Sequence, residues 1–322
     1  MHELLKVSGL KKYFKNRYGI LHAVDDVSFT LDAGKTLGVA GESGCGKSTL
    51  GRTIIGLLEP TDGEVLYMDQ DITHIKGRKR RRLSQDMQII FQDPFSSLKP
   101  RMSVWRLIAD PLITNRVFRS KVDLDKRVWE LMDTVGLARR FTYSFPHELD
   151  GGRRQRIGVA RALALEPRFI VCDEPVSALD VSIQAQILNL LQDLQEAKGL
   201  SYMFITHDLS VVKHISDEIM VMYVGCIVEK CPAKELFSRP MHPYTKGLLT
   251  AIPVPNINLK KERIIMRGEL STPIDPKPGC RFANRCSFVK QICTQEQPPY
   301  IEVTENHFVS CHYTREINAL DG

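Results

Sequence analysis

Residues 41–49 have the sequence GESGCGKST, which fits the pattern G-x-x-x-x-G-K-[ST]. This spacing is typical of a loop whose backbone amides wrap a triphosphate, provided that a strand precedes it and a helix follows. Residues 36–40 predict a buried strand, and residues 47–55 predict the first turns of a helix. Glycines let such a loop approach phosphate closely, and the helix directs the positive end of its dipole at the anion. The sequence therefore predicts a nucleotide-binding protein.

ATP and Mg2+ are the ligands expected at this loop. We expect Lys47 to hold the β- and γ-phosphates and the hydroxyl of Ser48 to ligate Mg2+. The loop residues expected to contact nucleotide are Gly41, Ser43, Gly44, Cys45, Gly46, Lys47, Ser48 and Thr49.

The length and composition of the chain indicate its number of domains, its location and its class of partner. A chain of 322 residues exceeds the usual size of one domain, so we expect a principal domain and an appendage. No stretch approaches the roughly 18 apolar residues of a membrane span, and the first residues lack the pattern of an export signal, so we expect a cytosolic protein.

The net charge of +6 is modest for this length and does not by itself imply nucleic acid. The basic cluster at residues 78–82 is interpreted as a solvated helix face without a role.

The chain's pattern changes along its length. Strand-like alternation near the start gives way to helical periodicity between about residues 93 and 150, which predicts a helical insertion. Alternating strands and helices return from Phe169 and imply a mainly parallel sheet covered on both faces. Near residue 252 the periodicity fades, and seven of the 17 prolines lie between Pro253 and Pro299. We therefore expect a principal domain at residues 1–252 and a small loop-rich extension at residues 253–322.

A second motif, FIVCDE at residues 169–174, places two carboxylates at the end of a buried strand. Open α/β sheets keep their active sites at such strand ends. We expect Asp173 to support Mg2+ and Glu174 to polarise the attacking water. This interpretation is strengthened because SALD follows at residues 177–180 and ITHD ends the next strand at residues 205–208.

In this order, over residues 4 to about 230, the motifs resemble the ATP-binding subunit of an ABC transporter. The resemblance implies a P-loop NTPase cassette with a mainly parallel core sheet, an antiparallel β subdomain and a helical subdomain. It implies that Phe14 stacks on adenine, with Tyr13 one residue away as the alternative, that Asp180 faces a partner subunit and that His207 contacts the γ-phosphate. Gln92 would join the metal site to the helical subdomain. The implied catalytic residues are Lys47, Gln92, Glu174 and His207, and the implied Mg2+ ligands are Ser48, Gln92 and Asp173.

The element HPYTKGLL at residues 242–249 is similar to the H-P-Y-T-x-x-L-L element of the dipeptide and oligopeptide importers. The segments PGCRF at 278–282 and RC at 285–286 resemble the extension of the same group. This narrower resemblance implies a heterodimer with a second homologous ATPase subunit, beneath two integral membrane permease subunits fed by an extracytoplasmic peptide-binding protein. It places the chain at the cytoplasmic face of the membrane, with no nucleic acid partner. Nickel complexes, glutathione or another small solute remain alternative substrates.

Four of the eight cysteines fall within the last 43 residues, with the spacing C-x5-C-x6-C-x17-C. In a cytosolic chain such a cluster indicates a metal or iron–sulfur site rather than disulfides. The set matches the cysteines that hold a [4Fe-4S] cluster in some members of the resembled family. Zn2+ and reduced thiols that pack as small apolar groups remain open, since four thiolates suit either metal centre. The four residues are Cys280, Cys286, Cys293 and Cys311.

One motif departs from the superfamily pattern. Where L-S-G-G-Q is usual, residues 149–153 are LDGGR. In a closed dimer this segment, with Gly151 and Gly152, would cap the partner's nucleotide. Ionised Asp150 cannot donate to a phosphate, and its repulsion at about 4 Å is of order 1–4 kcal/mol, although Arg153 would offset part of it. The sequence therefore predicts an asymmetric heterodimer in which the site capped by Asp150 is the weaker one.

Two other function classes share some of these motifs. Soluble ABC ATPases that act on DNA have a very long coiled coil between the phosphate loop and the signature, and those that act on ribosomes carry two cassettes. This chain has about a hundred intervening residues without heptads, and one cassette. The second alternative is a redox- or metal-sensing regulatory subunit whose ATP site serves only assembly. Glu174 and His207 argue against it, and Asp150 argues slightly for it.

Overall fold

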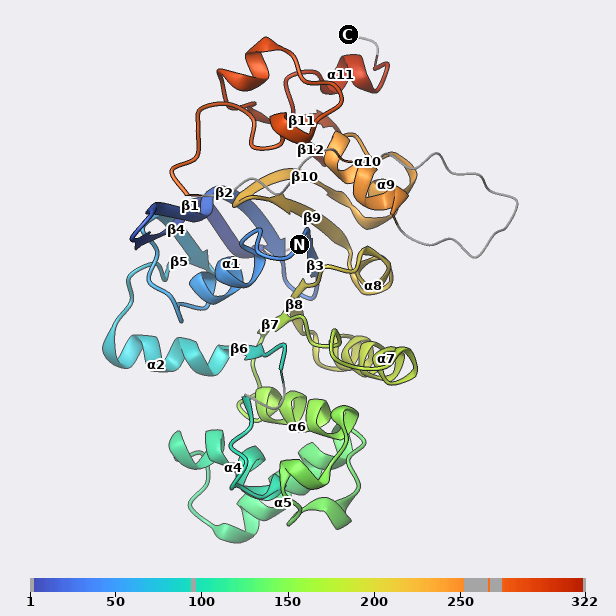
Figure 1. Cartoon of the computed structure of the whole chain (residues 1–322). Helices are drawn as coiled ribbons and strands as arrows, with labels where there is room; N and C mark the ends of the chain where they lie inside the picture. The colour runs from blue at the N-terminus through green and yellow to red at the C-terminus, as the bar shows by residue number, and fades with distance from the viewer. Residues whose placement is uncertain (1–2, 94–96, 252–265, 267–273, 321–322) are drawn as a thin grey trace, which may run out of the picture. The chain divides into compact units, whose positions relative to one another are not determined.

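The computed structural model describes residues 3–93, 97–251, 266 and 274–320. The predicted boundary between residues 252 and 253 lies outside the described residues, so the division into two domains stays a prediction. By their internal contacts, residues 1–74 and 204–322 form one compact unit and residues 75–203 form a second. Figure 1 shows the elements of both units, and each is described by itself.

The first unit contains a four-stranded antiparallel sheet in the order β2-β1-β4-β5. Its apolar positions include Leu5, Val7 and Leu10, which are buried, while Glu3 and Lys6 on the same strand are exposed. The expected antiparallel β subdomain is therefore confirmed. Its strands are β1 (Glu3–Asn16), β2 (Gly19–Asp32), β4 (Asp62–Tyr67) and β5 (Gln70–Asp71).

A second set of strands in the first unit runs in the order β11-β12-β10-β9-β3. Strand β3 pairs with β9 in parallel, and the other neighbours are antiparallel. Every residue of β3 is buried, as its apolar sequence predicts. The strands are β3 (Thr36–Ala40), β9 (Glu218–Tyr223), β10 (Cys226–Pro232), β11 (Tyr300–Thr304) and β12 (His307–Ser310).

The helices of this unit are short. They are α1 (Lys47–Ile54), α8 (Leu209–Ile215), α9 (Ala233–Ser238), α10 (Pro243–Thr250) and α11 (Thr314–Ile317), with the 3-10 turns η3 (Ala283–Arg285) and η4 (Gln291–Thr294). The C-terminal extension was expected to be rich in loops. Its described part adds two strands to a sheet, because β12 pairs with β10 from outside the extension.

The second unit is mainly helical. Strands β6 and β7 pair in parallel, as the sequence predicts for the core sheet, and β8 (Ser201–Ile205) leads back into the first unit. Helix α2, which contains the basic cluster, buries none of its residues, so the cluster is a solvated helix face. The elements are α2 (Gly77–Asp86), β6 (Met87–Ile90), α4 (Val104–Thr114), α5 (Lys121–Thr134), η1 (Arg139–Phe141), η2 (Pro146–Glu148), α6 (Gly151–Leu163), β7 (Phe169–Asp173) and α7 (Val181–Lys198).

The two units together give the mixed α/β fold that the sequence predicts, with parallel and antiparallel pairings. Over the described ranges, no helix combines the length and the apolar character that crossing a bilayer would require.

Candidate functional site

The phosphate loop lies where the sequence places it, between the end of β3 at Ala40 and the start of α1 at Lys47. Gly41 and Gly46 have φ values of +150° and +106°, a region that side chains rarely adopt. A Cβ at Gly46 would stand 2.0 Å from the carbonyl oxygen of Ala23, so no other residue fits there. The loop is thus held against the first unit's own backbone.

Lys47 is buried and closes this loop. Its ammonium donates to the carbonyl oxygens of Gly41, at 2.7 Å, and Glu42, at 2.9 Å. Ser48 is the second residue of α1, so the side chains expected to bind phosphate and Mg2+, those of Lys47 and Ser48, both start from the helix N-terminus. Phosphate oxygens are stronger acceptors than carbonyls because they carry negative charge, so a phosphate at this loop would compete with both carbonyls for the ammonium.

The two aromatic residues proposed for adenine differ in their surroundings. The Tyr13 hydroxyl donates to Asp25, and its ring stacks on His22 with centroids 3.9 Å apart. Phe14 is the next residue on β1, so its ring points to the other face of the strand. The ammonium of Lys12 lies 4.8 Å from the Phe14 centroid. Because Tyr13 is tied into the fold, the geometry favours Phe14 as the stacking residue.

Asp25 has further partners besides Tyr13. Burial raises the pKa of Asp25, but hydrogen bonds from Tyr13 and His22 and the charge of Arg281 outweigh it and hold this pKa below its ordinary value. Asp25 is therefore ionised at neutral pH. The pKa of the Tyr13 phenol is raised by burial and by the bond to Asp25, so Tyr13 remains the donor.

His207 follows β8 in the first unit and is exposed. The amide of Thr206 donates to the carbonyl of Val39 at 3.1 Å, so the end of β8 lies against β3 just before the phosphate loop begins. Asp208 then caps α8 by accepting from the amide of Ser210 at 2.8 Å. These contacts place His207 at the same strand ends as the loop, and its contact with a γ-phosphate stays a prediction.

The second unit contains the carboxylates. Asp173 ends β7 and is fully buried, and Glu174 is largely buried with a left-handed φ of +47°. A non-glycine residue in this region is strained by about 1–3 kcal/mol, and such strain clusters at functional sites. The Gln92 amide donates to Glu174 Oε2 at 2.9 Å across 82 residues of sequence. The structure therefore brings together Gln92 and Glu174, two residues that the resemblance assigned to one site.

Asp180 and Asp150 both serve as helix N-caps. Asp180 accepts from the amide of Ile183 at 3.0 Å at the start of α7. Asp150 Oδ1 accepts from the Arg153 amide at 2.8 Å, and its Oδ2 pairs with the Arg153 guanidinium at 2.5 Å. Both oxygens of Asp150 are thus engaged by one residue. Aspartate caps a helix as well as serine does, which explains locally how the departure from L-S-G-G-Q is accommodated, and Gly151 and Gly152 form the first turn of α6.

The four late cysteines come together in the first unit. All of them line one small cavity of about 10 Å3, together with Phe282 and His242. Burial raises the pKa of Cys280 to about 12, and the charges of its three cysteine neighbours add to the rise. The pKa values of Cys286 and Cys311 are raised for the same reasons. Four thiols that repel one another as thiolates form a donor set that a metal centre would stabilise, so the residues fit such a group.

The distances between the cysteine sulfurs are compared with those that zinc and a [4Fe-4S] cluster require. Tetrahedral zinc, with Zn–S bonds of about 2.3 Å, needs sulfurs about 3.8 Å apart. In the part of the chain that the structure describes, no three of the four cysteine sulfurs lie within 4.8 Å of one another. A [4Fe-4S] cluster holds its thiolates further apart because a separate iron atom binds each one, but the cavity has room for about one water-sized atom, so either centre requires the sulfurs to move.

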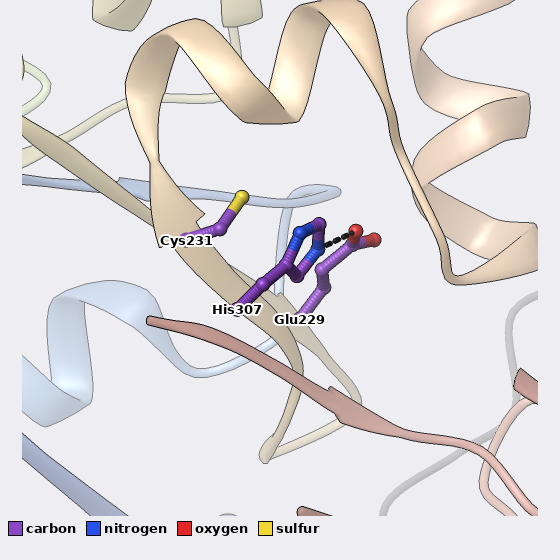
Figure 2. A group of neighbouring side chains, drawn as sticks. All are labelled: Glu229, Cys231 and His307. Atoms are coloured by element: carbon purple, nitrogen blue, oxygen red, sulfur yellow. Dashed lines mark hydrogen bonds and ion pairs between the residues drawn. The ribbon is translucent and has the colours of Figure 1, made fainter. Parts of the chain in front are cut away.

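Glu229, Cys231 and His307 form a second group with metal-ligating atoms, shown in Figure 2. His307 bonds through Nε2 to Glu229 at 2.7 Å and through Nδ1 to Glu235 at 3.1 Å. Glu229 also accepts from the amides of Met241 and His242, at 2.7 and 2.9 Å. Because both histidine nitrogens and both carboxylate oxygens are used, this group is interpreted as a polar node that joins β10, β12 and the start of α10.

Two residues of the extension lacked a role in the sequence analysis. Arg281 pairs with Asp25, and Arg285 pairs with Glu42 of the phosphate loop. Both lie inside the segment between Cys280 and Cys286. The cysteine motif drew attention to this segment, but the partners lie more than 240 residues away, so no local pattern could have indicated them.

Comparison with family models gives two matches. Residues 24–177 match the family model described as ABC transporter, and residues 228–293 match that described as oligopeptide/dipeptide transporter, C-terminal region. The first range includes the phosphate loop and Glu174, and the second includes the first three cysteines of the cluster.

Curated relatives match nearly the whole chain. The chain is 47% identical to the oligopeptide transport ATP-binding protein AppF of Bacillus subtilis, covering 96% of this chain and 97% of the relative. It is 48% identical to OppF of Salmonella typhimurium, over 96% and 95%, and 46% identical to the dipeptide transport ATP-binding protein DppF of Haemophilus influenzae, over 96% of each.

Solved structures agree on the fold and the family. The dimeric ATP-binding cassette MJ0796 bound to ADP and Pi matches with a TM-score of 0.66 and 29% identity, over 71% of this chain and 99% of that one. CbiO1 from Clostridium perfringens matches with a TM-score of 0.66 and 27% identity, over 74% and 92%. From its motifs, its fold and these relatives, the chain belongs to the family of ABC transporter ATPases, as an ATP-binding subunit that has the oligopeptide/dipeptide transporter C-terminal region.

Proposed function

We propose that this chain hydrolyses ATP to power the import of dipeptides or oligopeptides. Its relatives are named as oligopeptide and dipeptide transport ATP-binding proteins, and its C-terminal region matches the model for such transporters. In this proposal it forms a heterodimer with a second ATPase subunit at the cytoplasmic face of the membrane, beneath two permease subunits. An extracytoplasmic binding protein supplies the peptide.

The observation that carries the hydrolytic role is the contact between Gln92 and Glu174 at the end of β7. In the proposed reaction Glu174 orients a water toward the γ-phosphate, while Lys47 and His207 stabilise the negative charge of the transferred group. Mg2+, held by Ser48, Asp173 and Gln92, would supply further charge neutralisation. ADP and inorganic phosphate are the products, and the strained backbone of Glu174 fixes its carboxylate before ATP arrives.

The test of hydrolysis is Glu174→Gln in the assembled transporter. We expect ATP turnover to fall by a factor of about 100 or more while ATP binding persists, because the amide fills the same space without accepting a proton. Glu196→Gln, an exposed position on α7, is the matched control. Turnover that survives Glu174→Gln would instead favour a regulatory subunit whose ATP site serves assembly.

We further propose that the signature segment makes the heterodimer asymmetric. Asp150 has no proton to give to a partner's γ-phosphate, and both its oxygens are held by Arg153. This pairing supports the expected partial offset of the repulsion, and the amides of Gly151 and Gly152 remain as the donors of the segment. Asp180 is proposed to face the same partner. The site that Asp150 caps is then the weaker of the two.

The four cysteines are proposed to hold a [4Fe-4S] cluster, with Zn2+ as the alternative. The gathering of four thiols around one cavity supports a metal centre, and the family resemblance is what favours the cluster over zinc. Protein purified without oxygen should contain iron and show an absorption shoulder near about 400 nm. Cys293→Ser, at the most buried of the four thiols, should remove both signals, while Cys231→Ser outside the set should keep them. Zinc without iron in the wild-type protein would overturn the cluster in favour of the alternative.

A further inference from the structure

The segment between Cys280 and Cys286 contacts the phosphate loop directly. The Arg285 guanidinium makes two parallel bonds to the Glu42 carboxylate, at 2.8 and 3.1 Å. The exposed fractions of these side chains are 9% and 21%, so water screens the pair weakly. Bidentate arginine–carboxylate pairs fix orientation as well as distance. The cysteine segment therefore holds a residue of the nucleotide site in a defined position.

Glu42 is held in three ways. Its carboxylate binds Arg285, its amide donates to the Tyr244 hydroxyl at 2.9 Å, and its carbonyl accepts from Lys47 at 2.9 Å. Two of these partners lie after residue 240, in α10 and in the cysteine segment. A shift of Glu42 would therefore change the position of the ammonium that binds phosphate.

A second contact ties the same segment to the antiparallel sheet. Arg281 pairs with Asp25, which also accepts from the Tyr13 hydroxyl. The two arginines of one short segment thus bind one residue at the end of the Tyr13 side chain and one residue of the phosphate loop.

The segment is stiff and close to the cysteine cavity. Phe282 packs edge-on against Tyr223, with centroids 5.3 Å apart, and near Tyr244 at 5.5 Å. The Cys280 amide donates to the carbonyl of Cys293 at 2.7 Å. The cavity between the cysteines has room for about one water-sized atom, so any larger occupant must displace the segment that bears Arg285. Close packing transmits such a displacement instead of absorbing it.

We propose that Arg285 is a positioning residue that couples the state of the four-cysteine pocket to nucleotide binding at the phosphate loop. The proposal rests on the proposed function only in taking this loop as the ATP site. Coupling between two sites is reciprocal, so nucleotide must change the pocket by the same factor by which the pocket changes nucleotide affinity.

The experiment uses the full-length protein and measures the coupling in both directions: the effect of the pocket on nucleotide affinity and the effect of nucleotide on the four thiols. Affinity for the Mg2+ complex of a non-hydrolysable ATP analogue is determined by titration. The alkylation rates of Cys280, Cys286, Cys293 and Cys311 are followed by site-resolved mass spectrometry, with and without that analogue. In the wild-type protein we expect the analogue to slow alkylation at least about fivefold, the lower end of typical couplings.

Arg285→Gln should weaken analogue binding about fivefold or more and abolish the protection of the thiols. Lys290→Gln is the matched control, because it breaks an exposed ion pair with Glu316 in the same extension and should leave both readouts unchanged. Glu42→Gln should reproduce the effect of Arg285→Gln, and the double variant should add little to either. If Arg285→Gln does not fold, Glu42→Gln and Arg285→Lys provide the same comparison, with Arg285→Lys intermediate because one ammonium replaces a bidentate fork.

Equal protection of the thiols in wild-type protein and in the folded variants would overturn the coupling. Additive losses of analogue affinity in the double variant would also overturn the coupling. Neither readout involves hydrolysis or peptide. Loss of the coupling with hydrolysis intact would therefore refute this inference alone, whereas hydrolysis that survives Glu174→Gln would refute the proposed catalytic role alone.

Discussion

Single side chains decide the chemistry of the nucleotide site, and neighbours in sequence can have opposite roles. Tyr13 and Phe14 are both aromatic and adjacent, so the sequence pattern leaves their roles open. The structure distinguishes them by their contacts, because Tyr13 bonds to Asp25 and stacks on His22. A ring tied to its own fold in this way is less available to an incoming base.

Phe14→Ala is therefore expected to weaken ATP binding by a factor of about 10, since stacking of a base on an aromatic ring contributes about 1–3 kcal/mol. Tyr13→Phe should leave ATP affinity nearly unchanged and lower the free energy of unfolding by about 1 kcal/mol through the lost bond to Asp25. Titration with a fluorescent ATP analogue and urea denaturation measure the two effects. Wild-type affinity in Phe14→Ala would show that this ring does not stack on adenine.

At the scale of elements, the C-terminal strands are bound to the rest of the unit by a buried polar node. His307 of β12 lies between Glu229 of β10 and Glu235 of α9. Burial lowers the pKa of His307, but the hydrogen bonds and charges of the two carboxylates outweigh burial and raise this pKa above its ordinary value. Nearby His242 shows the opposite effect, because burial lowers its pKa to about 4 and its neutral ring accepts from the Tyr244 amide.

The node predicts a pH dependence of stability. Because the folded-state pKa of His307 is raised, its contribution is fully present below about pH 6.5, the pKa of unfolded histidine, and is lost as pH rises through the folded-state value. His307→Gln should remove this dependence and lower stability most at acidic pH. The measurement is the urea midpoint of both proteins between pH 6 and 9, with the partly exposed His312 mutated to Gln as the control. Parallel curves for wild type and His307→Gln would contradict a charged histidine in the node.

The sequence predicts a helix or strand well when the contacts that stabilise it are between residues close in sequence, and poorly when they are between distant residues. The sequence predicts the phosphate loop, β3 and β7, because the residues that determine them lie within a few positions of one another. The sequence does not indicate the strands β11 and β12, because β11 pairs with β12 and β12 is stabilised by pairing with β10, about 80 residues earlier. The bond between Arg285 and Glu42 spans 243 residues and has no local signature. Site residues whose motifs are contiguous were thus recognisable, and residues that position them from a distance were not.

At the scale of the whole molecule, the residues assigned to ATP chemistry are divided between two compact units. Lys47, Ser48 and His207 belong to the first, and Gln92, Asp173 and Glu174 belong to the second. The second unit also contains the signature segment, which acts on another subunit's nucleotide in the proposed heterodimer. The effect of Asp150 must therefore be sought in the assembled transporter, where the two ATP sites can be compared.

Asp150 has a local role and a proposed role across the heterodimer, and two substitutions separate them. Asp150→Ala removes the cap of α6 and should lower the free energy of unfolding by about 1 kcal/mol, whereas Asp150→Ser keeps a capping oxygen and should change it by a few tenths. In the assembled transporter Asp150→Ser should also raise turnover at the second site about fivefold, which corresponds to relief of about 1 kcal/mol of repulsion. Turnover at that site is isolated by combining each variant with Glu174→Gln, which silences the site built from this chain's own phosphate loop. A rise in both variants would assign the gain to relief of the repulsion, and a rise in Asp150→Ser alone would assign it to the restored hydroxyl donor. Equal turnover in all three proteins would show that the heterodimer tolerates aspartate and is not asymmetric for this reason.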